Sequence, residues 1–73
     1  MSGRDWNYRV MRHIEPDGRE WLALHEVRYD AAGQPRGWTE EEASPGGETL
    51  DDVRADLKHM LAALELPVLE FDA

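Results

Sequence analysis

The sequence predicts a single α+β domain, in which a three-stranded antiparallel meander carries one C-terminal helix on one face. Two runs near the N-terminus alternate apolar and polar residues and are separated by turn residues. A later run repeats apolar residues at intervals of three and four, which is the period of a helix. With 73 residues and no cysteine, the chain can form one domain without disulfides. We expect an ordered core over about residues 5–66 and an extended tail over 67–73.

The first strand is predicted to run from Trp6 to Ile14, because aromatic and β-branched residues recur there at alternate positions. Asp17-Gly18 follows, which is a strong signal for a two-residue hairpin turn. The second strand is then predicted over about residues 20–29. A two-residue turn pairs Val10 with His25 and places Arg9 opposite Glu26, which is a favourable pair of charges.

This register divides the side chains of the two strands between two faces, since one slip would exchange them. The face toward the helix is expected to carry His25 and the apolar set Trp6, Tyr8, Val10, Ile14, Trp21, Ala23, Val27 and Tyr29. The opposite face is expected to carry an exposed patch of Met11, Leu22 and Leu24 beside Glu26. Either a partner or the tail, through Val68, Leu69 and Phe71, would cover this patch.

The third strand is predicted from Arg36 to about Glu42, after a hairpin loop in which Gly33 takes the left-handed position. The loop length is open by one residue, so the facing of Trp38 stays open as well. The helix is predicted to begin after Thr49, an N-cap with Asp52 three residues on, and Pro67 limits its end to about Leu64 or Glu65. Its apolar residues form one stripe, expected to pack on the sheet: Leu50, Val53, Leu57, Met60, Leu61 and Leu64.

Charge disfavours two function classes, nucleic-acid binding and binding to anionic membranes. The formal net charge is −8, with sixteen acidic and eight basic residues, and such a chain repels nucleic-acid phosphates and anionic membranes. No apolar run approaches the roughly 20 residues that span a bilayer, and the N-terminus lacks the apolar region of a signal peptide. We therefore predict a cytoplasmic protein without a membrane contact. A nucleic-acid-binding module remains an alternative.

Candidate catalytic residues are few. His25-Glu26 is the most enzyme-like pair, but neighbours in a strand point to opposite faces. His13, His25 and His59 are scattered, so no zinc site is expected, and Glu40–Glu42 is interpreted as a solvated edge. No nucleophile or phosphate-loop motif occurs. The prediction is a non-enzyme without cofactor or metal, with a small enzyme using His25 and Glu26 as an alternative.

The segment GGETLDDVRADLKHML resembles the strand-to-helix segment of HicB-like antitoxin domains, with Gly47, Glu48, Thr49 and Leu50 carrying the match. The resemblance implies a β-β-β-α core that binds and neutralises a small toxin with a double-stranded-RNA-binding fold, often as an oligomer. Most of the chain is also similar to a family of short bacterial proteins with no assigned activity, including the Pro67-Val68-Leu69 segment.

Taken together, these features predict a protein-interaction module, of which an antitoxin-type domain is one form. Its candidate surface is Met11, Leu22, Leu24 and Glu26. The expected partner is another protein or a second copy of the chain. An acidic surface would suit a basic partner.

Overall fold

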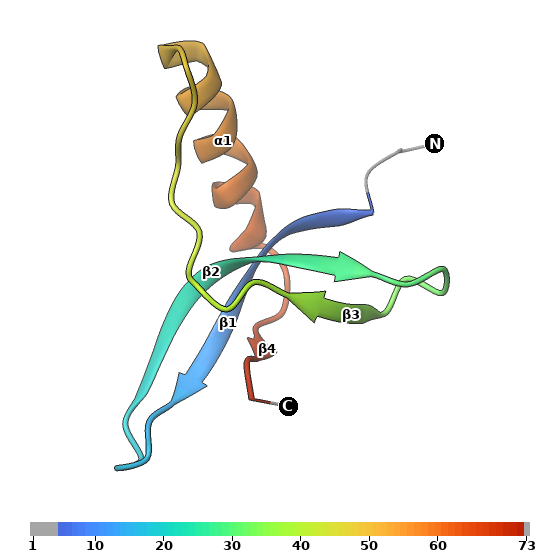
Figure 1. Cartoon of the computed structure of the whole chain (residues 1–73), viewed down its shortest axis with the longest axis vertical. Helices are drawn as coiled ribbons and strands as arrows, with labels where there is room; N and C mark the ends of the chain where they lie inside the picture. The colour runs from blue at the N-terminus through green and yellow to red at the C-terminus, as the bar shows by residue number, and fades with distance from the viewer. Residues whose placement is uncertain (1–4, 73) are drawn as a thin grey trace.

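The computed structural model describes residues 5–72, which form one sheet and one helix (Figure 1). The elements are β1 (Trp6–Ile14), β2 (Glu20–Tyr29), β3 (Pro35–Trp38), α1 (Leu50–Ala63) and β4 (Leu69–Glu70). The strand order is β3-β2-β1-β4, in which β1 and β2 pair antiparallel, as do β2 and β3. The α+β class and the three-stranded meander are thus confirmed, but the tail adds a fourth strand.

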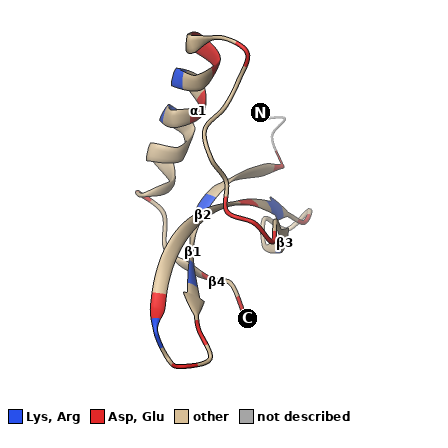
Figure 2. Ribbon diagram, turned by 60° about the vertical axis from the view of Figure 1, so that its left-hand side comes forward, with Lys and Arg blue, Asp and Glu red and all other residues tan. Residues whose placement is uncertain are grey.

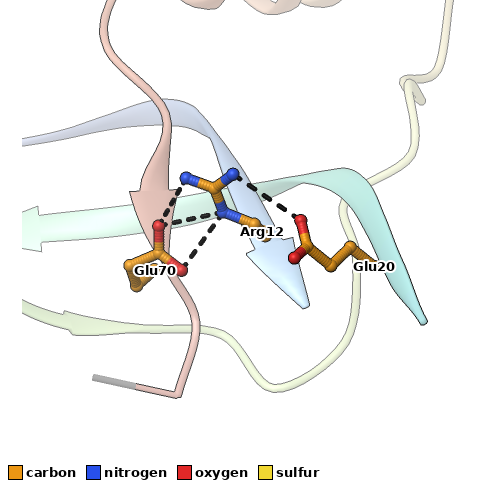
Figure 3. Close-up of polar contacts among 3 residues, drawn as sticks. All are labelled: Arg12, Glu20 and Glu70. Carbon is orange, nitrogen blue, oxygen red and sulfur yellow. Dashed lines mark hydrogen bonds and ion pairs between the residues drawn. The ribbon is translucent and has the colours of Figure 1, made fainter. Parts of the chain in front are cut away.

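The tail becomes β4 because it pairs parallel to β1, with Leu69 beside Met11 and Glu70 beside Arg12. The backbone N–H of Phe71 donates to the Arg12 carbonyl at 2.9 Å. The Arg12 guanidinium also binds the Glu70 carboxylate at 2.7 Å and lies 3.7 Å from that of Glu20 (Figure 3). One side chain of β1 therefore joins both neighbouring strands on the exposed surface.

The predicted two-residue turn is wrong, because the loop between β1 and β2 has three residues. The Gly18 N–H donates to the Glu15 carbonyl at 2.8 Å, and the Glu15 N–H donates to the Arg19 carbonyl at 2.8 Å. Pro16 suits the first central position of a type I turn, and Gly18, with φ of 91°, takes the left-handed position that follows. The loop between β2 and β3 closes in the same way around Gly33, as predicted, with φ of 82°.

The extra loop residue shifts the register by one, so every side chain of β2 exchanges faces. Tyr8 lies opposite Glu26 and Val10 opposite Leu24, whereas Arg9 lies opposite His25. The predicted Arg9–Glu26 pair is therefore absent, and His25 points away from the helix.

The helix start follows the sequence prediction. The Thr49 side chain accepts from the Asp52 N–H at 3.1 Å, and the Asp52 carboxylate accepts from the Glu48 N–H at 3.3 Å. These reciprocal bonds satisfy donors that the first turn leaves free. Gly47 is required beside them, because a Cβ there would lie 2.3 Å from the Cβ of Asp52.

The sheet buries side chains on both faces. Beneath α1, a small core joins Tyr8, Met60 and Ala63. On the other face, Met11 and Val27 are fully buried. This happens because the sheet curls until its edge strands β3 and β4 line one common hollow (Figure 1).

The third strand is shorter than predicted, ending at Trp38 rather than near Glu42. Trp38 pairs with Val27, which places it on the face opposite the helix and decides the facing that the sequence left open. The following acidic run, residues 40–42, is exposed and lies outside the strand.

Candidate interaction surface

The helix turns most of its leucines to solvent. Of its residues, Met60 and Ala63 are buried against the sheet. Four leucines, which we call the leucine stripe, have the following exposed fractions: Leu50 79%, Leu57 49%, Leu61 64% and Leu64 61%. The prediction that the whole apolar stripe packs on the sheet is therefore wrong.

Asp56 explains the rotation of α1. The Tyr8 hydroxyl donates to one carboxylate oxygen of Asp56 at 2.5 Å, and the Gly46 N–H donates to the other oxygen at 3.1 Å. Asp56, Met60 and Ala63 follow one another at spacings of four and three, so they share a side of the helix. With that side against β1, the leucine stripe lies about 90° further round the helix axis, facing solvent.

The charges around the stripe are mixed. Arg54 and Lys58 flank the leucine stripe on the side of the helix away from Asp56. Arg54 binds the carboxylate of Asp51 at 2.6 Å. Acidic residues gather at the N-terminal end of α1 and in the loop before it (Figure 2). The stripe is thus an apolar surface with a polar rim, which is the composition of a protein contact surface.

The patch predicted from the sequence does not form. Met11 is fully buried, and Leu24 packs against the small core beneath α1. Leu22 is 58% exposed and Glu26 is exposed, but both lie on the face that carries the helix, not on the face of Met11. The sequence left open whether a partner or the tail covers the face opposite the helix. The tail covers it in part, because Phe71 packs against His13 and His25 there.

Two histidines meet on the face opposite the helix. His13 and His25 are buried, and their Nε2 atoms lie 2.8 Å apart. The His13 ring stacks between Trp21 and Phe71, with ring centroids 3.9 and 4.2 Å away. Sequence reasoning missed this pair because the wrong register put the two histidines on opposite faces.

The partners of the pair assign its protons. The His25 Nδ1 lies 2.9 Å from the Thr39 carbonyl oxygen, which can only accept, so Nδ1 carries the hydrogen. In the neutral ring, His25 Nε2 is then the acceptor and His13 Nε2–H the donor. Burial is the largest effect on His25 and lowers its pKa below the usual 6.5. The hydrogen bond to Thr39 opposes this shift, a charge on His13 adds to it, and Glu42 and Glu41 oppose it more weakly.

We expect the domain to lose stability as the pH falls from about 7.5 to 5. A histidine with a lowered pKa binds more protons unfolded than folded, so its contribution is complete above the unfolded pKa and lost below it. Urea unfolding followed by circular dichroism across this range measures the effect. His25→Gln should flatten the curve, while His59→Gln, an exposed control, should leave it unchanged. An equal slope in the His25 variant would contradict the assignment.

The buried side chain of Arg9 holds the tail against the sheet. Buried Arg9 donates to the Tyr29 hydroxyl at 2.9 Å and to the Pro67 carbonyl at 2.7 Å, which ties β1 to the tail. Within residues 5–72, no group of three or more acidic or histidine side chains is placed to hold a metal ion. The same range contains no helix long and apolar enough to cross a membrane.

Comparisons with protein families, curated proteins and solved structures found no match to this chain.

Proposed function

We propose that the protein is a non-catalytic protein-interaction module whose contact surface is the leucine stripe of α1. The observation that carries the proposal is the exposure of four leucines on one side of α1, three within the 14-residue helix and the fourth, Leu64, at its C-cap. Small proteins seldom leave a contiguous apolar surface in water without a partner.

The weak attachment of the helix supports the same conclusion. The helix contributes only Met60 and Ala63 to the core that it shares with Tyr8 of β1. Trp6, Leu24 and Ala43 pack at the margin of this core. A short helix draws most of its stability from tertiary packing of its apolar side. A partner on the leucine stripe would supply the packing that the sheet does not.

A basic protein is one class of partner that the charge favours. The chain carries a net charge of −8, and its run of three glutamates at 40–42 is exposed. Complementary charge speeds association and selects partners, and this effect weakens with salt. The HicB-like resemblance implies an antitoxin-type role, in which the partner would be a toxin of this basic class.

The test compares three tagged proteins in capture experiments from native lysate, identified by mass spectrometry. They are the wild type, the double variant Leu57→Glu and Leu61→Glu, and the control Leu22→Glu, whose exposed leucine lies in β2. At a protein concentration low enough to keep the chain monomeric, we expect the double variant to keep its unfolding midpoint, because both leucines are exposed in the single chain. It should nevertheless lose what the wild type and the control capture. Identical capture by all three would contradict the proposal.

A further inference from the structure

Five apolar residues of α1 and its C-cap are placed symmetrically about Leu57. Leu50 and Leu64 each stand seven residues from it, and Val53 and Leu61 each stand four. Two such helices packed antiparallel, with Leu57 on a two-fold axis, would place Leu50 against Leu64 of the second copy. Val53 would likewise meet Leu61, so every layer would match apolar with apolar. A two-fold contact requires a surface that is complementary to itself, and this pattern meets that requirement.

The size of the molecule agrees with a missing partner. The accessible surface is 5561 Å², whereas a compact monomer of 8.4 kDa has about 4,600 Å². The radius of gyration is 13.2 Å, against about 11 Å for a compact chain of this length. The chain therefore exposes roughly 900 Å² more surface than a compact monomer of its mass.

The shape of the chain favours the antiparallel arrangement. Figure 1 shows α1 rising from the sheet, with its N-terminal end furthest from the strands. Leu50, at that end, is the most exposed large apolar residue of the chain's described part. An antiparallel copy would cover it with the C-terminal end of the second helix, where Leu64 is 61% exposed. Opposed helix dipoles also favour this direction over a parallel one.

We infer that a second copy of this chain occupies the leucine stripe, forming a two-fold dimer of antiparallel α1 helices centred on Leu57. This inference rests on the proposed function, because it names the partner of the same surface. It also predicts an unusual dependence on salt. Two chains of charge −8 repel each other, so added salt should leave the dimer unchanged or tighten it, whereas it would loosen a complex with a basic protein.

The first experiment is sedimentation equilibrium of the purified chain. We expect twice the mass of 8.4 kDa for the wild type and for Leu22→Glu. Leu57→Glu with Leu61→Glu should weaken self-association at least about 100-fold, because each buried leucine contributes about 1.5–3 kcal/mol. A wild type that stays monomeric up to about 1 mM overturns the inference.

The second experiment tests the direction of the helices. Because the chain has no cysteine, Leu50→Cys and Leu64→Cys each introduce a single thiol. Under mild oxidation, each variant alone should remain uncrosslinked, and a mixture of the two should form a disulfide between unlike chains. Crosslinking of each variant with itself would indicate parallel helices and overturn the arrangement.

The two proposals fail in different ways. If the wild type is monomeric but captures another protein through Leu57 and Leu61, the dimer inference falls and the proposed function stands. If the chain dimerises and the double variant dimerises equally well, while Leu22→Glu does not, the dimer inference falls, and the capture experiment decides the proposed function separately.

Discussion

Replacing Met11 by alanine should lower the free energy of unfolding by about 2–5 kcal/mol, the usual cost of truncating a fully buried methionine. The Met11 side chain has no exposed surface, and it lies beside β2 and β4 where the sheet curls over itself. Because the surrounding side chains cannot collapse fully into the space, the loss exceeds the transfer energy of the deleted atoms. Urea unfolding followed by circular dichroism at one low protein concentration measures it.

Leu22→Ala is the matched control, because the predicted two-residue turn placed Leu22 beside Met11 in one exposed patch. Leu22 is 58% exposed, so its truncation should change the free energy by less than about 0.5 kcal/mol. Met11→Leu, which conserves volume, should cost less than about 1.5 kcal/mol and guards against a Met11→Ala variant that fails to fold. Equal, small losses for both alanine variants would contradict the register of β1 and β2.

Element positions were predictable because the signals for them are local. The bounds predicted for β1 and β2 agree with the structure, as does the helix start, since Thr49 and Asp52 act within one turn. The left-handed Gly33 belongs to the same class of local signal.

The register was predictable in principle, and Pro16 carried the signal. A type I′ turn over Asp17-Gly18 needs positive φ at both positions, and in the described residues no residue other than glycine has it. Proline before Asp-Gly instead favours a type I turn followed by a left-handed glycine, which makes the loop one residue longer. That single residue moved His25 beside His13 and buried Met11.

The rotation of α1 was not predictable from local patterns. Its apolar residues occupy two adjoining sides of the helix, one with Met60 and Ala63 and one with the leucine stripe, and periodicity does not say which side is buried. The choice depends on Asp56, whose partners Tyr8 and Gly46 lie 48 and 10 residues away. The resemblance to HicB-like domains stays a prediction. The residues it shares include Glu48 and Thr49, whose hydrogen bonds with Asp52 cap the helix.

Truncating Phe71 to alanine should cost about 2–3 kcal/mol, somewhat less than the 3–5 kcal/mol of a fully buried phenylalanine, because Phe71 is half-buried. Its ring stacks on His13 at 4.2 Å and lies 5.1 Å from the His25 ring, so it shields the histidine pair from water. Val68→Ala, in the same tail but 41% exposed, should change the free energy little and serves as the control.

The Phe71 variant should also alter the titration of His25. Burial is the largest cause of its lowered pKa, so admitting water should move that pKa back toward 6.5 and flatten the loss of stability at low pH. Histidine ring resonances followed by NMR from about pH 8 to 5 report the pKa, and urea unfolding across the same range reports the stability. A Phe71→Ala protein with full stability and an unchanged His25 titration would mean that β4 does not cover this face. The dimer inference would survive that result, because the leucine stripe lies on the other side of the sheet, whereas the tail would lose its role as the second cover of the core.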